Sequence, residues 1–275
     1  EIEVVEEIFD PAAARAYGLE KGQIAIMLHS GSRGLGHQVC DDYLARMVKH
    51  LGELDVELPD RQLACAYLST PRGQDYLAAM ACAANYAWAN RQLLMHWVRE
   101  AFEKTLSISP KMLSMRLLYD ICHNIAKIET LPVDGKDRSL CVHRKGATRA
   151  LPAGHPLVPA AYRNIGQPVL IPGDMGSGSY VLTGTTKALE ETFGSSCHGA
   201  GRVMSRTQAT KSCRGHSITN DMADKGVIVM ASGRGTLAEE IPEAYKNLDW
   251  VVDVVHRAGI AKKVARLRAL GCIKG

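Results

Sequence analysis

The residues Ser195-Ser-Cys-His-Gly-Ala-Gly-Arg-Val-Met-Ser-Arg206 form the stretch around which the rest of this 275-residue chain is organised. His198 is followed by a Gly-Ala-Gly run, which leaves room for a bulky group to approach its imidazole. We expect a helix to begin here with Arg202 and Arg206 one turn apart, and its positive end would favour a phosphate. The stretch therefore indicates an anion-binding site, although a glycine-rich turn before a surface helix fits the same residues.

The composition bounds the class of protein. Apolar residues make up 46% and charged residues 23%, which is typical of a soluble globular chain with one sizeable core. No apolar run approaches the ~20 residues needed to cross a bilayer, and the acidic start is no signal peptide. Eight scattered cysteines without a Cys-x-x-Cys pair favour a reducing, cytoplasmic location. The net charge of +4 permits a polyanionic partner but does not require one.

A second glycine-rich loop follows a short apolar strand predicted over residues 23–28. It reads His29-Ser-Gly-Ser-Arg-Gly-Leu-Gly-His37, and a helical pattern follows over about 39–51. A strand, a loop and a helix in this order can place backbone N–H groups around a phosphate, but the glycine spacing matches neither common nucleotide-binding fingerprint. His29 can serve as a metal ligand or have a purely structural role, and Arg33 can hold a phosphate.

Residues 74–104 contain no proline and predict one long, mostly buried helix, with Trp88 and Trp97 in the core. Beyond it, the Asp134-Gly135 turn predicts an antiparallel hairpin whose second strand includes residues 139–143.

Two polar groups lie on this hairpin. His123 and Asn124 stand inside an otherwise apolar segment, where polar side chains require a partner or a ligand. The run from His143 to Arg149 brings four cationic or imidazole side chains together, as either a solvated loop or a second loop that faces phosphate.

The rest of the chain continues to alternate strands and helices. Strands predicted over 168–171 and 180–183 flank the loop Pro172 to Ser179, and a strand over 227–231, a helix over 248–258 and a strand over 264–273 follow. Because no regular βαβ rhythm is present, we expect a mixed α/β or α+β architecture. An N-terminus that begins within a strand pattern and without methionine suggests an N-terminally truncated chain.

Four motifs occur together: His29 to His37, His123-Asn-Ile-Ala-Lys127, His143-Arg-Lys-Gly-Ala-Thr-Arg149 and Cys197-His-Gly-Ala-Gly-Arg202. In this order and spacing the chain resembles the RtcB family of GTP-dependent RNA ligases along its whole length. The resemblance implies an RtcB-like fold in a single large domain, residues 1–275, which forms the C-terminal portion of the catalytic domain.

The resemblance also implies a role for each matching position. His198 matches the catalytic histidine that attacks the α-phosphate of GTP and carries GMP, and His29 and His123 match ligands of one of two Mn²⁺ ions. The positions that match guanylate-binding residues are Glu1, Asn124, Pro172, Gly173, Asp174, Met175, Ser179, His198, Gly199, Ala200, Gly201, Tyr245 and Lys274. The positions that match phosphate- and RNA-binding cations are Arg33, Lys145, Arg202 and Arg206.

Among the guanylate-binding positions, Glu1 and Lys274 match residues at the guanine edge, and Tyr245 matches an aromatic residue stacked near the base. The implied reaction joins RNA 3′-phosphate or 2′,3′-cyclic phosphate ends to 5′-hydroxyl ends in tRNA splicing or RNA repair. The implied cofactors are GTP and Mn²⁺, and the implied partners are RNA, as tRNA halves or broken RNA, and an archease-type activator. A neutral imidazole is a competent nucleophile for the first step.

The chain departs from the family pattern in three places. The N-terminal Asp and Cys metal ligands of the family have no counterpart, so His29 and His123 form an incomplete ligand set and the chain alone is not expected to close a two-metal site. Asp174 stands where a small hydroxyl residue is expected, and Ala269 replaces an expected proline.

Two other functions fit the same residues. A metal-dependent RNA phosphatase or cyclic phosphodiesterase would use the histidines without a covalent nucleotide. An inactive paralogue would retain RNA binding alone.

Overall fold

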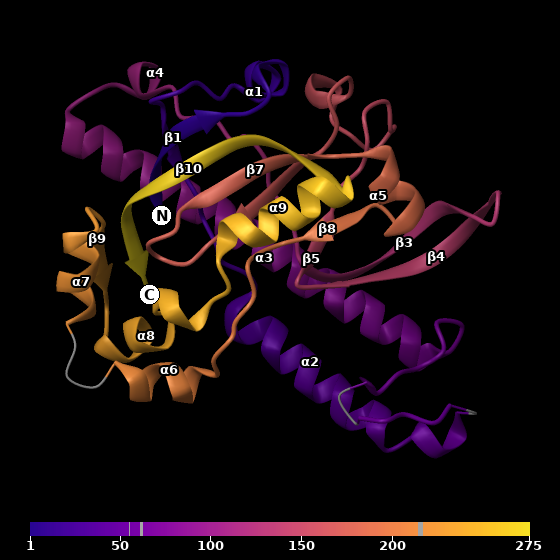
Figure 1. The fold of residues 1–275 in the computed structure, drawn as a ribbon. Coiled ribbons are helices and arrows are strands. Elements are labelled where there is room, and N and C mark those ends of the chain that lie inside the picture. Colours follow the sequence, from indigo (N-terminus) through magenta and orange to yellow (C-terminus); the bar gives the residue numbers. More distant parts are fainter. Residues whose placement is uncertain (55, 61–62, 214–216) are drawn as a thin grey trace. The chain divides into compact units, whose positions relative to one another are not determined.

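The computed structural model describes residues 1–54, 56–60, 63–213 and 217–275 (Figure 1). These residues form a mixed α+β fold, which confirms the expected fold class. They divide into two compact units, of which one comprises Glu1–Met27 with Ile121–Gly275 and the other comprises Leu28–Asp120. The assignment of residues 1–275 to one catalytic domain stays a prediction.

The first unit is built on a six-stranded sheet in which β10 (Ala261–Lys274) is central. The strands run in the order β2 (Ile24–Ile26), β1 (Ile2–Ile8), β10, β7 (Ser179–Gly184) and β6 (Pro168–Pro172), and all these neighbours are antiparallel. The remaining strand, β9 (Ile228–Ala231), pairs with the end of β10 in parallel. The strands predicted over 23–28, 168–171, 180–183, 227–231 and 264–273 are present as β2, β6, β7, β9 and β10.

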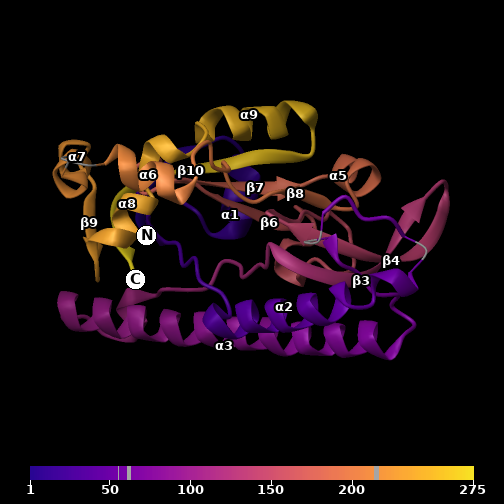
Figure 2. The ribbon, with the colours of Figure 1, turned by 90° about the horizontal axis from the view of Figure 1, so that it is seen from below.

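Helix α9 (Leu248–Ala258) covers one face of this sheet (Figure 2). The Asn247 side chain caps its first turn by accepting a hydrogen bond from the Trp250 N–H, and Gly259 ends it at a positive φ of 77°. Its buried residues Leu248 and Val252 join a core with residues of β6 and β7, namely Val169, Ile171, Tyr180 and Leu182. This apolar contact holds the helix on the sheet.

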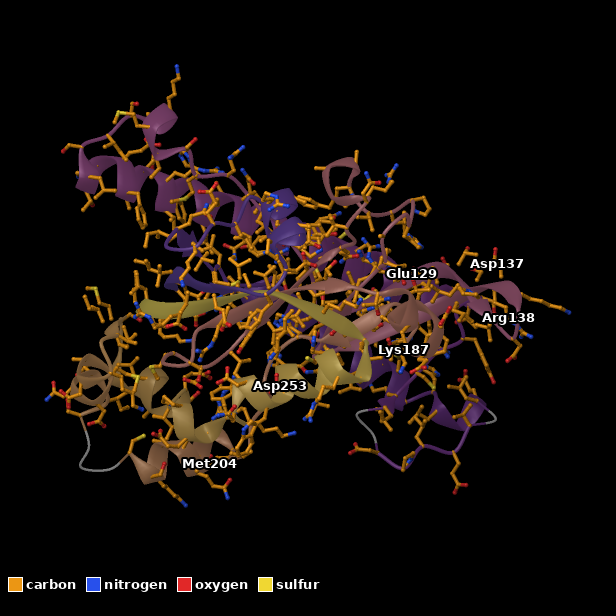
Figure 3. All side chains as sticks on the ribbon, turned by 45° about the horizontal axis from the view of Figure 1, so that its top comes forward. Glu129, Asp137, Arg138, Lys187, Met204 and Asp253 are labelled. Atoms are coloured by element: carbon orange, nitrogen blue, oxygen red, sulfur yellow. The ribbon has the colours of Figure 1, made fainter. Side chains whose placement is uncertain are left out.

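The predicted hairpin is confirmed as β3 (Asn124–Val133) and β4 (Lys136–Lys145). Both turn residues, Asp134 and Gly135, have positive φ angles, 51° and 73°, as a tight turn that matches the strand twist requires. Asp137 and Arg138 follow the turn at the far end of the hairpin (Figure 3). After β4, the short strand β5 (Ala147–Arg149) pairs with β8 (Ser195–Cys197). Strand β8 forms the start of the 195–206 stretch, here called the opening stretch.

Short helices complete the first unit. They are α1 (Pro11–Tyr17), α5 (Thr186–Glu191), α6 (Arg206–Ser212), α7 (Ile218–Asp224) and α8 (Arg234–Glu239), with 3₁₀ turns at Ala160–Tyr162 and Pro242–Ala244. The helix expected to carry both arginines of the opening stretch is shorter than predicted. A capping box formed by Ser205 and Gln208 starts α6 at Arg206, so Arg202 lies outside it, in a β-bridge with Tyr245.

The second unit consists of helices: α2 (Arg33–Val48), a 3₁₀ turn (Leu51–Glu53), α3 (Pro71–Leu106) and α4 (Pro110–Leu113). Helix α2 begins before residue 39, so Arg33 to His37 belong to its first turns and not to a loop. Helix α3 lies alongside α2 (Figure 2), and the long helix expected here is confirmed.

The expected burial of the α3 tryptophans is wrong, because Trp88 is 40% and Trp97 is 56% exposed. The buried positions of α3 are instead mostly small, including Ala83 and Ala87. A Cβ atom at Gly36 of α2 would lie 3.8 Å from the Ala83 Cβ, so small residues allow the two helices to approach and the large rings point elsewhere. Among the described residues, no helix combines the length and apolar character that crossing a bilayer demands.

Gly178 offers a test of the loop between β6 and β7. Its φ is +74°, and a Cβ atom there would lie 2.1 Å from the Leu267 carbonyl oxygen of β10. We expect Gly178→Ala to lower the free energy of unfolding by well over the ~1–2 kcal/mol of left-handed strain alone.

Gly135→Ala is the matched control, since it has a φ of +73° with open space around the added Cβ atom. Urea unfolding of both variants measures the difference, and equal losses would contradict the close packing of this loop on β10.

Candidate functional site

His198 follows β8 and is fixed to two other segments of the first unit. Its backbone N–H donates to the Gly146 carbonyl at 3.3 Å. The Gly146 N–H in turn donates to the His123 carbonyl at 2.9 Å and to the Asn124 side-chain oxygen at 3.2 Å. The Asn124 side chain therefore has a partner, and together with the His123 carbonyl it helps to hold the backbone at His198.

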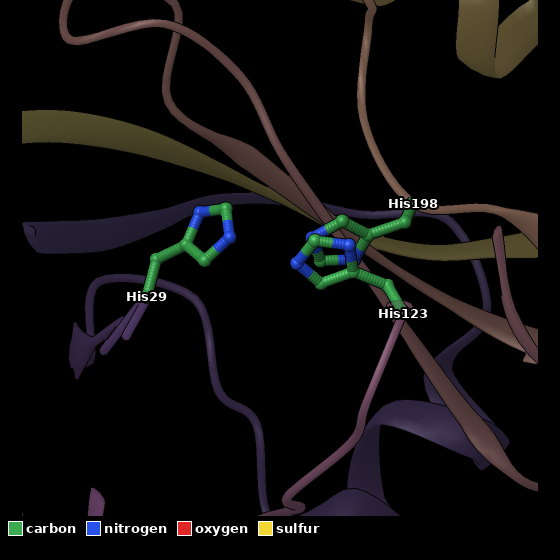
Figure 4. Close-up of side chains that lie close together, drawn as sticks. All are labelled: His29, His123 and His198. Atoms are coloured by element: carbon green, nitrogen blue, oxygen red, sulfur yellow. The ribbon is translucent and has the colours of Figure 1, made fainter. Parts of the chain in front are cut away.

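The rings of His123 and His198 lie one on the other (Figure 4), with centroids 3.7 Å apart and planes at 10°. Two imidazoles from distant segments thus meet at one point, which restricts the orientation of both rings. His29, which Figure 4 also draws, and Arg33 belong to the Leu28–Asp120 unit, and their part in the site stays a prediction.

Glu1 and Lys274 lie at neighbouring ends of β1 and β10. The Lys274 ammonium is 3.9 Å from the Glu1 carboxylate, and the Cys272 thiol donates to the same carboxylate oxygen at 3.9 Å. Pairing with β9, and a hydrogen bond from the Ser232 N–H to the Lys274 carbonyl, hold the lysine in place. A lysine this close to the end of a chain is usually frayed, but here the strand fixes it.

The loop after β6 contains Asp174, at a position where the resemblance predicts a small hydroxyl residue. Its buried carboxylate accepts hydrogen bonds from the Gly176 N–H at 2.8 Å, from the Ser177 N–H at 3.0 Å and from the Ser177 hydroxyl. Burial raises the pKa of the Glu1 carboxyl, and the negative charge of Asp174 raises it further. Asp174 is therefore a structural carboxylate of its own loop that also acts electrostatically on Glu1.

Ser179 donates its hydroxyl to Glu3 at 2.8 Å, and both residues are fully buried. Glu3 is not among the residues predicted from the sequence. A charged residue at an inward-facing position of an apolar strand, two residues after Glu1 and therefore on the same face, is a signal that could have identified it. Burial, together with the Glu1 charge, raises the pKa of Glu3 to about 7.

The basic run on β4 divides into a buried and an exposed part. Arg144, which is 3% exposed, donates two hydrogen bonds to the Glu129 carboxylate at 2.9 and 2.8 Å. It also donates to the Ser195 hydroxyl at 2.9 Å and the Phe193 carbonyl at 3.0 Å, and thus braces β8 just before His198. The expectation that the whole run could face a phosphate is wrong for Arg144, whereas Lys145 is exposed.

The two arginines of the opening stretch differ in their surroundings. Arg206 is 70% exposed and lies 3.3 Å from Glu239. Arg202 is largely enclosed, and its guanidinium lies 4.9 Å from the centre of the Tyr245 ring. The structure thus brings Arg202 and Tyr245 together and leaves Arg206 open to solvent.

Glu129 tests the brace behind His198. Removing one partner of a buried ion pair leaves a buried charge uncompensated, so we expect Glu129→Gln to cost about 3 kcal/mol of unfolding free energy. Glu191→Gln is the control. Glu191 forms an ion pair with Lys187, which Figure 3 labels, and the two side chains are 58% and 49% exposed. Such a surface pair contributes below about 1 kcal/mol. Urea unfolding measures both variants, and similar losses of unfolding free energy in Glu129→Gln and Glu191→Gln would contradict the assignment of Glu129 to a buried brace.

Glu3 should make stability depend on pH. Its folded pKa of about 7 lies above the value of 4.5 for an ordinary Glu, so the unfolded chain loses this proton first as pH rises. The free energy of unfolding should therefore fall between about pH 4.5 and pH 7, by up to about 3 kcal/mol, and then level off. Glu3→Gln should remove this part of the decline. Urea unfolding of both proteins at several pH values checks it, and identical pH profiles would refute it.

Comparison with known proteins shows the family of the chain. The family described as tRNA-splicing ligase RtcB matches residues 1–275. The tRNA-splicing ligase RtcB of Archaeoglobus fulgidus is 56% identical over 275 residues, which make up 100% of this chain and 57% of that protein. The corresponding protein of Methanococcus maripaludis is 51% identical over the same span, again 57% of its length. For Methanocaldococcus jannaschii the identity is 52%, over 100% of this chain and 28% of that protein.

The chain thus spans little more than half the length of the first two of these relatives. Because the match covers every residue from 1 to 275, the chain belongs to the RtcB family.

Proposed function

We propose that this chain is the guanylate-carrying portion of a GTP-dependent RNA ligase, which joins RNA 3′-phosphate or 2′,3′-cyclic phosphate ends to 5′-hydroxyl ends. The observation that carries the proposal is the placement of His198, stacked on His123 and braced from behind, within a family member 56% identical to a tRNA-splicing ligase. The substrates proposed are tRNA halves or broken RNA.

In the proposed reaction a nitrogen of His198 attacks the α-phosphate of GTP. An N–P bond forms, and the bond from the α-phosphorus to the bridging oxygen breaks to release pyrophosphate. A 2′,3′-cyclic phosphate end is first hydrolysed, so that water breaks the bond from phosphorus to the 2′-oxygen and leaves a 3′-phosphate and a 2′-hydroxyl. An oxygen of the 3′-phosphate then attacks the phosphorus of the GMP, and the histidine leaves as the N–P bond breaks. Finally the RNA 5′-hydroxyl attacks the activated phosphate, and GMP leaves as the RNA bond forms. The stacked ring of His123 favours an imidazole already oriented for the first attack.

The geometry of the opening stretch supports a nucleotide beside His198. Gly201 has a φ of +73°, and an added Cβ atom at Gly199 would lie 3.5 Å from the Pro172 carbonyl oxygen. A side chain would be strained at Gly201, so glycine there allows the chain to turn sharply just after His198. The guanylate is proposed to reach from here to the guanine end at Glu1 and Lys274. The other proposed guanylate contacts are Asn124, Gly173, Asp174, Met175, Ser179, Ala200 and Tyr245.

The family's metal requirement fits the donor chemistry in part. Imidazole nitrogens are common ligands of divalent transition metals, and we propose that His29 and His123 hold Mn²⁺. A bound Mn²⁺ would neutralise triphosphate charge and orient it for in-line attack. This pair is too small a ligand set by itself, so the remaining ligands are proposed to come from outside residues 1–275.

Lys145, Arg206 and Arg33 are the cations proposed to hold the RNA backbone, and RNA affinity should fall with salt. All eight cysteines are free thiols, as a reducing, cytoplasmic location would favour. An archease-type activator remains a proposed partner, to be tested by its effect on the rate of His198 guanylylation.

GTP labelled at the α-phosphate, with Mn²⁺, tests the function. The assay uses the 275-residue chain and a fusion that adds the part of the A. fulgidus relative not covered by the match. We expect acid-labile label on the fusion, loss of at least ~90% of it in His198→Ala, and retention in His143→Ala, an exposed histidine of the same unit.

The ligase assignment would be refuted if the His198→Ala variant still took up the label, or if the fusion took up no label at all. Hydrolysis of a 2′,3′-cyclic phosphate without GTP would favour the phosphodiesterase. Salt-sensitive RNA binding with neither activity would favour the inactive paralogue.

A further inference from the structure

The guanidinium of Arg202 is surrounded by acceptors from the protein itself. Its Nε–H donates to the Met204 carbonyl at 3.1 Å, and Nη2 donates to the Glu239 carbonyl at 2.6 Å. Its Nη1 donates to the Tyr245 hydroxyl at 2.9 Å and to the Glu240 carboxylate at 3.3 Å. Four of the five N–H groups of an arginine are thus engaged, which leaves little for a phosphate.

Glu240 binds both partners of this arrangement. One carboxylate oxygen accepts from Arg202, and the other accepts from the Tyr245 hydroxyl. Burial, and then the bond to Glu240, raise the pKa of Tyr245 to about 12, so its hydroxyl remains a donor. The Arg202 guanidinium also lies 4.9 Å from the centre of the Tyr245 ring, within the range of a cation–π contact. The ring is consequently held at its hydroxyl and over its face.

The backbone joins the same two segments. The Lys246 N–H donates to the Gly201 carbonyl at 3.0 Å, and the Val203 N–H donates to the Ala244 carbonyl at 2.8 Å. Because Gly201 lies three residues after His198, the Tyr245 segment and the His198 loop form one connected piece. A displacement of the Tyr245 ring would therefore require Arg202 to break its contacts on both sides.

We propose that Glu240 is a positioning residue that, through Arg202, fixes the ring of Tyr245 relative to His198 and so sets where the guanine binds. The proposal rests on the proposed function, which puts Tyr245 beside the base. It assigns Arg202 to this brace. Arg206, which is 70% exposed and lies 3.3 Å from Glu239 and 4.0 Å from Glu240, is left as the phosphate-facing arginine of the stretch. A ring fixed in advance binds the base without an ordering cost, so Glu240 acts on GTP affinity more than on the chemical step.

The test measures how the labelling of His198 depends on GTP concentration. It uses whichever of the two proteins described above, the 275-residue chain or the fusion, takes up the label, and Glu240→Gln is the main variant. Glutamine keeps the shape but weakens the charge-assisted bonds, so the half-saturating GTP concentration should rise about tenfold. The maximal labelling rate and the salt dependence of RNA binding should stay within about twofold. Glu243→Gln, on an exposed residue of the same segment, is the control and should leave the half-saturating concentration unchanged.

Tyr245→Phe keeps the ring and removes the hydroxyl held by Glu240. It should raise the half-saturating GTP concentration in the same direction, and the double variant should be no worse than about the more affected single variant. This non-additivity distinguishes a brace from general destabilisation, since independent losses of stability would add. Thermal unfolding identifies any variant that fails to fold.

The competing interpretation makes the opposite prediction. If Glu240 merely occupied Arg202 in place of a phosphate, Glu240→Gln would free the arginine to bind phosphate. The variant would then either lower the half-saturating GTP concentration or steepen the salt dependence of RNA binding. Either result, or an unchanged half-saturating concentration in a labelled protein, overturns the positioning role and leaves the ligase assignment intact. A wild-type protein that takes no label overturns both.

Discussion

Strand β10 is the constraint on which the first unit depends, because it hydrogen-bonds to β1, β7 and β9. Its register places Ala269 opposite Glu3 of β1 and Leu267 opposite Ser179 of β7. Register partners in an antiparallel pair share a face, so Glu3 must reach across β10 to accept the Ser179 hydroxyl. The small side chain of Ala269 is compatible with that passage.

Buried and partly buried charged groups gather around the segments that carry the proposed nucleotide site. Glu129 and Arg144 form an ion pair behind β8. Glu3 of β1 accepts the hydroxyl of Ser179 of β7. Arg202 and Glu240 join the His198 loop to Tyr245. Apolar packing is tolerant of small shifts, whereas a bidentate ion pair or a short charged hydrogen bond fixes angle as well as distance. The first unit therefore combines an ordinary apolar core under α9 with directional polar contacts beside His198.

The sequence predicts the elements well where a local rule decides them. The Asp134-Gly135 turn specifies its hairpin through two positive φ angles, and helix α9 has the predicted bounds, 248–258, with Gly259 at a positive φ just after them. The start of α2 was misplaced because Gly34 and Gly36 read as loop residues, although both fit in the first turns of that helix. The α3 tryptophans were misplaced because a long apolar helix gives no sign that its buried side is made of small residues.

The motifs of the candidate site can be read from the sequence, but the contacts between them cannot. The roles of His198, Tyr245 and Lys274 follow from the family resemblance and stay predictions. That Arg144 turns inward while the adjacent Lys145 stays outside depends on Glu129, which is a neighbour only once the hairpin has formed. Glu240 is likewise remote from Arg202 in sequence, and no spacing rule connects them.

The pairing of β1 with β10 also sets an order of events during synthesis. The contact between Glu1 and Cys272 joins residues 271 positions apart. At about 5–20 residues per second, a ribosome needs roughly 15 to 55 s between making the two. Until then β1 has only the short β2 as a strand partner, and no Lys274 stands beside Glu1. The pair of Glu1 and Lys274 thus forms only after the His198 loop has been made, so a chain that stops before Lys274 would display that loop without the pair.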